Sequence, residues 1–437
     1  MKKGILLLTL CLVLLIGCAT YKHEWQSLTN EAMSLYRNSE YARAEELAKK
    51  ALEIADSAVG PDHPNVADSL NNLGLIYHAQ GEYAQAEPLY KRALAMAERA
   101  VGPNHPYVAG RLNNLAELYR AQGRYAEAEP LYLRSLAIKE ETLGPKHPSI
   151  AMSLNNLAAL YCDLGVYAQA EPLYERCLAI REEVYGPDHP EVATCLNNLA
   201  GLYQDQGKYN KAEQLYERSL MIVEKTLGPN HPDVANRLNN LAELYRDQAR
   251  YLEAEPLYLR SLAIWEKTFG PGHPDVANSL HNLSRLYCNQ GKFAQAEPLS
   301  MRSLEIVETA LGSEHPRTAI VLCGLAEVYR NQGEYTQAEP LYERSLAITE
   351  KALGPDHPFI AKILYYFALL YHDQGQYTEA EPLFGRSLTI WENTMGADHP
   401  KMAEYLESMA DLYRKTGREK EAEVLEQRVE AIRTATR

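Results

Sequence analysis

Histidines are the residues of this chain whose type and spacing most suggest chemistry. A His-Pro pair occurs nine times, and each histidine lies 42 residues after the one before, as from His63 to His105. The nine histidines are His63, His105, His147, His189, His231, His273, His315, His357 and His399. Because imidazole nitrogens are common metal ligands and general bases, a metal centre or a catalytic site is the first hypothesis to test.

The spacing of the histidines argues against a shared metal ion. Zinc needs its ligands about 2 Å away, whereas equivalent residues of neighbouring repeats should lie about 10–20 Å apart, given the usual packing distances of helices. We therefore predict a structural role for these histidines, such as a helix cap, and no metal site. The sequence also lacks the common nucleotide, zinc-protease and serine-hydrolase motifs. Catalysis needs one convergent set of groups, which a repeat does not supply. We predict no enzyme activity and no cofactor.

Asparagines form the second repeated polar pattern. Five L-N-N motifs place two asparagines at the same positions, and a sixth repeat carries His281 and Asn282 there. The five pairs are Asn71-Asn72, Asn113-Asn114, Asn155-Asn156, Asn197-Asn198 and Asn239-Asn240. Asparagine is a weak helix former, so its recurrence in mid-helix needs a reason. Two interpretations stay open: the first asparagine bonds neighbouring repeats together, or the second binds a peptide backbone through its donor and acceptor groups.

Two helices in each 42-residue unit would position these polar residues. Apolar residues of the first half of one unit follow a helical period and end at Gly81, a typical helix stop. They are Ala67, Leu70, Leu73, Gly74 and Tyr77. The second half has the stripe Ala86, Leu89, Tyr90, Ala93, Leu94, Ala97 and Val101, followed by Gly102 and Pro103. Pro88 and its equivalents predict a bend in the second helix or a later start of it. Since neither helix can bury its stripe alone, the units must stack.

The small and aromatic residues at these positions resemble the tetratricopeptide pattern. The 42-residue period, the repeated L-N-N-L-A and A-E-P-L-Y runs and the G-P-x-H-P loop resemble the kinesin light chain type of that repeat. This resemblance implies an all-α fold, an α-solenoid of about ten antiparallel helix hairpins in a tetratricopeptide superhelix. We predict that the array covers residues 23–437, as ten units of which the first and last are degenerate caps.

The resemblance also implies where a ligand would bind. In tetratricopeptide proteins the first helix of each unit lines the concave face, and the second asparagine matches a ligand-facing position there. The peptide-binding groove implied in this way contains Asn72, Asn114, Asn156, Asn198, Asn240, Asn282, Arg120, Arg246, Arg330, Asp163, Asp205 and Asp247. The asparagines stop at Gly324, Tyr366 and Ser408. There Tyr365, Tyr366 and Phe367 predict a more aromatic inner surface.

The implied partner is a peptide or protein, and the implied function is a non-catalytic interaction scaffold. Kinesin light chains take acidic cargo peptides on a basic groove, and the aspartates of this chain depart from that pattern. The lysines of the carboxylate clamp in chaperone-binding repeats are also missing, because asparagine stands in their place. The net charge of −14 argues against nucleic acid as a partner. Five scattered cysteines in the array predict no disulfide framework.

The first residues of the chain differ from the array. Lys2 and Lys3 precede an apolar run that is too short to span a bilayer but suits a secretory signal. The run ends Leu15-Ile16-Gly17-Cys18, which resembles the bacterial lipobox. The resemblance implies a signal peptide over residues 1–17, a lipid-modified Cys18, a short tether over 18–22 and an extracytoplasmic protein anchored to a bacterial membrane. Because Ala19 stands where a retention aspartate would be, the outer membrane is favoured over the inner. The other interpretation is an ordinary signal with a chance cysteine.

Alternative functions remain open at this point. Tetratricopeptide lipoproteins can be envelope-assembly subunits or pilotins, and a chain with a misread leader would be a cytoplasmic adaptor like a kinesin light chain. An enzyme or binder of glycans would need a convergent pair of acids, which the sequence does not show.

Overall fold

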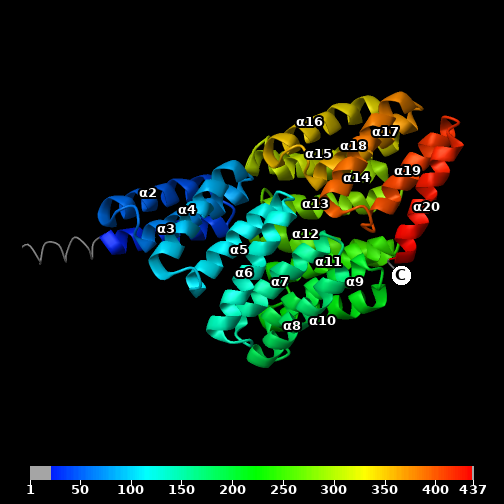
Figure 1. The fold of residues 1–437 in the computed structure, drawn as a ribbon. Coiled ribbons are helices and arrows are strands. Elements are labelled where there is room, and N and C mark those ends of the chain that lie inside the picture. Colours follow the sequence, from blue (N-terminus) through cyan, green and yellow to red (C-terminus); the bar gives the residue numbers. More distant parts are fainter. Residues whose placement is uncertain (1–20, 436–437) are drawn as a thin grey trace, which may run out of the picture. The chain divides into compact units, whose positions relative to one another are not determined.

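The computed structural model describes residues 21–435, and every regular element in this part of the chain is a helix (Figure 1). The predicted signal peptide and Cys18 lie outside the described residues. A helix over residues 21–37 pairs with α2 and precedes nine further hairpins. This arrangement confirms the predicted all-α solenoid of ten hairpins. Between residues 21 and 435, no helix is long and apolar enough to cross a membrane.

The helices of each hairpin have nearly constant lengths. The first helices are α3 (Pro64–Ala79), α5 (Pro106–Ala121), α7 (Pro148–Asp163), α9 (Pro190–Asp205), α11 (Pro232–Asp247), α13 (Pro274–Asn289), α15 (Pro316–Gln332), α17 (Pro358–Asp373) and α19 (Met402–Lys415). The second helices are α2 (Tyr41–Val59), α4 (Tyr83–Val101), α6 (Tyr125–Leu143), α8 (Tyr167–Tyr185), α10 (Tyr209–Leu227), α12 (Tyr251–Phe269), α14 (Phe293–Leu311), α16 (Tyr335–Leu353), α18 (Tyr377–Met395) and α20 (Glu419–Ala435).

The chain forms two compact units. The described part of the first unit is residues 21–119 and 130–144, and that of the second is residues 120–129 and 145–435. The tip of the α5–α6 hairpin therefore belongs to the second unit. The first unit has an apolar core around Trp25, Val66 and Met96. The second unit has a continuous core from Val192 to Val321 and a further core around α17 to α20.

The loop histidines cap the first helices. In each of the nine loops the histidine Nδ1 accepts the backbone N–H of the residue two positions later, at 3.0 to 3.3 Å. The following proline occupies a position where its missing N–H would have no helical partner. The predicted structural role of the histidines is confirmed, because an unpaired N–H at each helix start is what the imidazole satisfies.

The second helices differ from the prediction in two places. α4 begins at Tyr83, so Pro88 lies inside the helix and the predicted late start is wrong. Proline is tolerated there because Pro88 and Ala84, four residues before it, are both exposed, and water can reach the carbonyl left without an N–H. Val101 is 42% exposed, so the buried stripe of α4 ends at Ala97, near the helix end.

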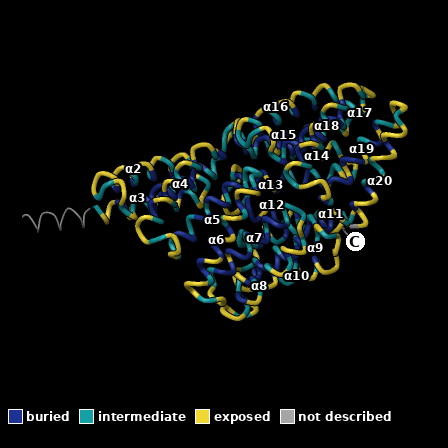
Figure 2. Tube along the Cα trace, in the orientation of Figure 1, coloured by how far each residue is buried: buried dark blue, intermediate teal, exposed yellow. Residues whose placement is uncertain are grey.

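Two kinds of contact hold the hairpins together. Within a hairpin, a buried serine hydroxyl of the second helix donates to an alanine carbonyl of the first, as from Ser219 to Ala193 at 2.7 Å. Between hairpins, a tyrosine hydroxyl donates to a glutamate of the preceding second helix, as from Tyr203 to Glu171 at 2.8 Å. Figure 2 shows the buried residues along the middle of the hairpins and the exposed residues at their turns.

Distant repeats of the second unit also contact each other. His357 Nδ1 accepts the N–H of Phe359, so its Nε2 donates to the carbonyl of Ala121, 3.1 Å away. One repeat later, a Cβ added at Gly165 would lie 2.7 Å from the His399 ring, so this ring packs closely on the glycine. Burial lowers the pKa of each of these two histidines to about 4. The starts of α17 and α19 are therefore docked on the turns that follow α5 and α7.

Candidate functional site

The candidate site is the surface formed by the first helices of the second unit. Consecutive first helices from α7 to α19 contact one another directly, which places them on the inside of the curve. We call this the inner surface. It consists of the position of the second asparagine and the exposed positions one turn before and after it on each first helix.

Asparagine pairs join the first helices across this surface. Asn198 Nδ2 donates to Asn155 Oδ1 at 2.6 Å, and Asn240 donates to Asn197 at 2.9 Å. Asn282 donates to Asn239 at 3.0 Å, and in the first unit Asn114 donates to Asn71 at 2.8 Å. In these four pairs the second asparagine of a repeat thus bonds to the first asparagine of the repeat before.

This geometry gives both asparagines of a pair a structural role. The first is the more buried, with Asn71 4% exposed and Asn197 8% exposed. The second asparagines, Asn72, Asn114, Asn156, Asn198, Asn240 and Asn282, are half-buried and still reach solvent. Ligand binding by these six residues stays a prediction.

The charged residues that the resemblance placed in the groove form ion pairs. Arg120 Nε lies 2.5 Å from Asp163 Oδ2, in the next repeat. Arg246 is buried and lies 2.8 Å from Asp247 and 2.9 Å from Glu243. Four of these predicted site residues are therefore brought together in pairs, and Asp247 also accepts a hydrogen bond from Gln204.

Among the charged predicted site residues, Asp205 forms no ion pair or hydrogen bond in the described part of the chain. Its side chain is exposed on the inner surface. Desolvation by the surrounding protein raises the pKa of the Asp205 carboxyl above its ordinary value, while Lys401 opposes this shift. Asp163, Glu243 and Asp247 add to the rise, so this stretch of the inner surface is acidic.

The inner surface changes after α13. Gly324 replaces the second asparagine of α15, and the His281 ring fills the space, since an added Cβ would lie 2.3 Å from it. In α19, Ser408 Oγ bonds to Tyr365 at 2.9 Å. Tyr365 is buried and reaches across to the next repeat, and Phe367 occupies the buried leucine position of the core. The predicted aromatic surface is therefore wrong except at Tyr366, which is half-buried.

Three charged inner-surface residues were missed by the sequence analysis. They are Arg285 on α13, Glu327 on α15 and Lys362 on α17. A signal for them existed, because each lies three or four residues from a second-asparagine position and so shares its helix face.

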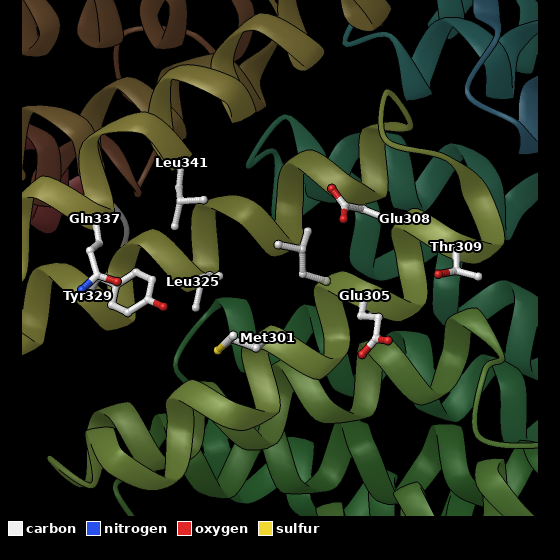
Figure 3. A pocket seen from close by; sticks show the side chains of 9 residues that line it. Met301, Glu305, Glu308, Thr309, Leu325, Tyr329, Gln337 and Leu341 are labelled. Carbon is white, nitrogen blue, oxygen red and sulfur yellow. The ribbon is translucent and has the colours of Figure 1, made fainter.

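An apolar hollow lies elsewhere on the second unit. It measures about 530 Å³ and is lined by α14, α15 and α16, with Met301, Leu325 and Leu341 among its walls (Figure 3). None of the asparagine positions lines it. Between residues 21 and 435, no three His, Cys, Asp or Glu side chains gather as metal ligands would.

Comparison with known proteins gives both a family and a fold. The sequence model of the tetratricopeptide repeat matches nine overlapping stretches: residues 26–99, 70–141, 107–165, 149–225, 196–255, 234–309, 285–351, 317–374 and 359–435. Among curated proteins, none matches the chain.

Three solved structures illustrate the similarity. A putative kinesin light chain of Podosopora anserina, with nearly identical TPR-like repeats, is 32% identical and covers 47% of this chain and 97% of its own, with a TM-score of 0.40. BtubC (BKLC) of P. vanneervenii is 27% identical over 53% of this chain and 92% of its own, with a TM-score of 0.44. A Rap protein complexed with Competence and Sporulation Factor is 15% identical and covers 95% of this chain and 98% of its own, with a TM-score of 0.54. At this identity the Rap structure shows a shared fold alone.

Proposed function

The chain belongs to the tetratricopeptide repeat family, and from this premise we propose that it is a non-catalytic scaffold that binds a peptide or protein partner on its inner surface. One observation carries the proposal. Half-buried asparagines recur at one position on consecutive first helices, and each uses only one N–H in its bond to the preceding repeat. The remaining amide groups suit a peptide, whose backbone donors and acceptors recur along its length.

The fold comparison supports this proposal. The Rap structure covers nearly the whole of this chain and was solved with its factor bound. A solenoid of this fold can therefore hold a partner. The ion pairs of the inner surface would hold its charged side chains in place and leave some of its polar groups available to a partner.

A photo-crosslinking experiment tests the proposed surface. A photoreactive amino acid replaces Asn240 on the inner surface, and a matched variant carries it at Gln295, which is exposed on α14. We expect detergent-solubilised membranes of the source cells to yield a crosslinked partner with the first variant and not with the second. Equal crosslinking at both positions, or none at Asn240, would contradict the proposal.

We propose further that the protein is anchored through a lipid on Cys18 and lies outside the cytoplasm, at the outer membrane. The support is the Leu15-Ile16-Gly17-Cys18 sequence after an apolar run. Several acyl chains on one cysteine anchor a protein stably, whereas one chain binds only marginally.

The anchor is tested by labelling with a clickable fatty acid. We expect the wild type to be labelled and to sediment with membranes, and Cys18→Ala to be unlabelled and released or uncleaved. An unlabelled wild type would remove the anchor. The mass of the mature N-terminus separates the alternatives, because an intact leader favours a cytoplasmic adaptor. Co-purification of the labelled protein with a stable membrane complex would favour an envelope-assembly subunit.

A further inference from the structure

Two buried cysteines of neighbouring hairpins face each other inside the second unit. Cys177 lies on α8 and Cys195 lies on α9, the first helix of the next hairpin, and neither side chain is exposed to solvent. Both are free thiols in the structure. They form a hydrogen bond with each other, in which the Cys195 thiol donates to the Cys177 sulfur. The two sulfurs are therefore in contact although they belong to different repeats.

An ion pair beside the cysteines fixes the register of α8 against α9. Arg181 is buried one turn after Cys177, and its Nη1 donates to the backbone carbonyl of Glu191 at 2.9 Å and pairs with the Glu191 carboxylate. Glu191 lies one turn before Cys195. Because the two helices are joined by a short loop and run antiparallel, this ion pair places the adjacent turns, with Cys177 and Cys195, against each other. The helix register thus supports the contact of the thiols independently.

Cysteine occupies both of these positions in one pair of neighbouring repeats alone. The other repeats mostly hold serine or alanine in place of Cys177, and serine, arginine or a larger apolar residue in place of Cys195. Serine stands at both positions in two pairs of repeats, Ser135 with Ser153 and Ser261 with Ser279, so small polar side chains suit this contact. Cysteine is of similar size and adds a group that can be oxidised.

The surroundings favour the thiolate form of Cys177. The hydrogen bond from Cys195 lowers the pKa of Cys177, and the Arg181 guanidinium adds to this shift, which burial opposes. The contact with Cys177 and burial raise the pKa of Cys195. Burial also raises the pKa of Cys162 and of Cys288 to about 12. Because the thiolate is the nucleophile of disulfide exchange, Cys177 is the thiol of the pair suited to attack an oxidant.

We propose that Cys177 and Cys195 are oxidised to an intrachain disulfide that links the α7–α8 hairpin to the α9–α10 hairpin. The oxidant is a disulfide, that of a thiol oxidoreductase or of oxidised glutathione. The Cys177 thiolate attacks one sulfur of the oxidant and releases the other, and the Cys195 thiolate then attacks Cys177 Sγ and releases the first. The two cysteines lose two electrons, which the oxidant gains, and their two protons pass to its released thiols.

Burial determines when this bond can form. Because neither thiol is exposed, an oxidant reaches them before α9 packs on α8, or when the two helices separate locally. The folded protein then shields the bond from reductants. Disulfides persist in oxidising compartments, so the inference rests on the proposed location outside the cytoplasm. Zinc, another ligand of paired thiols, takes four protein ligands in structural sites, and between residues 21 and 435 no three His, Cys, Asp or Glu side chains gather.

The test is a peptide map of the full-length protein from its source cells. The cells are lysed in denaturant with N-ethylmaleimide, which caps free thiols, and the protein is digested with trypsin. Cleavage after Arg181 leaves the two cysteines in separate peptides, 177–181 and 182–208. We expect mass spectrometry to find these two peptides joined by a disulfide, and the peptide with Cys162 capped by the maleimide. Capped thiols on both of the first two peptides would overturn the inference.

Melting curves measure what the bond does for the fold. We expect wild type refolded with oxidised glutathione to melt about 5 °C above wild type refolded with a reductant, because the bond restricts the unfolded chain. The double variant Cys177→Ser with Cys195→Ser carries the serines that other repeats hold at both positions, so it should fold and show no such difference. The control variant Cys288→Ala should keep the difference. Equal melting of wild type after both treatments would overturn the inference.

These outcomes can be told apart from those of the anchor test. If the fatty acid labels Cys18 while Cys177 and Cys195 are both capped, the disulfide is absent and the anchor stands. If the two cysteines are linked and Cys18 is unlabelled, the disulfide stands and the anchor fails. Neither result changes the outcome of crosslinking at Asn240.

Discussion

Two regions of the second unit share the same hairpin structure but differ in the contacts, here called joints, that link successive first helices. From α7 to α13, successive first helices are joined by asparagine pairs at 2.6 to 3.0 Å. From α13 to α19, the same places hold an imidazole on a glycine and a tyrosine bonded to a serine. Histidine caps and serine-to-alanine bonds continue through both regions. The contacts inside a hairpin are therefore the same in both regions, whereas the joints between hairpins are made by different side chains.

The two kinds of joint also differ in whether their buried polar groups have hydrogen-bond partners. Each of the three asparagine pairs from α7 to α13 matches a donor to an acceptor, whereas the contact of His281 with Gly324 leaves a buried ring nitrogen without a partner. Lys362 also lies in this second region without an ion pair in the described chain. The inner surface from α13 to α19 thus differs from that of α7 to α13 in the side chains that join its first helices.

Among changes at these joints, Gly324→Asn should have the largest effect on stability. It would give α15 the asparagine of the other repeats, but its Cβ would come 2.3 Å from the His281 ring. We expect a loss of about 3 kcal/mol from overpacking, seen as a lower melting temperature. Adding His281→Asn removes the ring and restores an asparagine pair, so the double variant should recover most of the loss. A single variant as stable as wild type would show that the two joints are interchangeable.

Removing three asparagine donors should have the next largest effect. In Asn198→Ala, Asn240→Ala and Asn282→Ala combined, three bonds between repeats are lost. Each lost bond costs about 1 kcal/mol, partly offset by the better helix propensity of alanine, so we expect a total loss of about 2 kcal/mol. The matched control is Asn278→Ala, which is exposed on α13.

The same triple variant tests the groove. Partner affinity at a temperature where the variant remains folded should also fall if the second asparagines bind a ligand. Full affinity in a folded variant would leave these residues with a structural role alone.

Acid should weaken the docking of α17 and α19. The pKa values of His357 and His399 are lowered from 6.5 to about 4, so the folded protein favours their neutral forms. Their contribution to stability is complete above pH 6.5 and is lost progressively as the pH falls towards 4. Replacing both with asparagine, which caps helices without titrating, should flatten the fall in melting temperature between pH 7 and 5. An unchanged slope would mean that other groups control it.

Ala249→Gly should have the smallest effect, which is a gain in stability. Ala249 has a φ of 58°, where the equivalent turns carry glycine, as at Gly207 and Gly291. An L-residue is strained in this left-handed conformation, so we expect a gain of about 0.5 kcal/mol. Thermal melting of Ala249→Gly beside Gly291→Ala, which should lose stability, measures both directions. A loss in Ala249→Gly would show that the alanine side chain packs favourably in its turn.

Features that depend on a single repeat could be predicted from the sequence, whereas contacts that depend on how the repeats stack could not. The 42-residue period and the helix stops predict the hairpins, and the His-Pro loops predict the caps. The exposure of Val101 differs from the periodic pattern because neighbouring helices decide it, whereas the burial of Phe367 follows that pattern at the leucine position of the repeat. The ion pair of Arg120 with Asp163 and the isolation of Lys362 could not be derived, since each requires knowing which side chains of different repeats meet.

The docking of His357 on Ala121 sets the number of repeats that lie between them. The two residues are 236 positions apart in sequence, with five complete hairpins, α7 to α16, between them. An open solenoid can gain or lose a repeat and keep every neighbour contact. Here an added or deleted 42-residue unit would shift the second unit's later repeats by one step. His357 would then lose the carbonyl of Ala121, and His399 would lose the glycine on which it packs. These two contacts are therefore compatible with one number of repeats between α5 and α17.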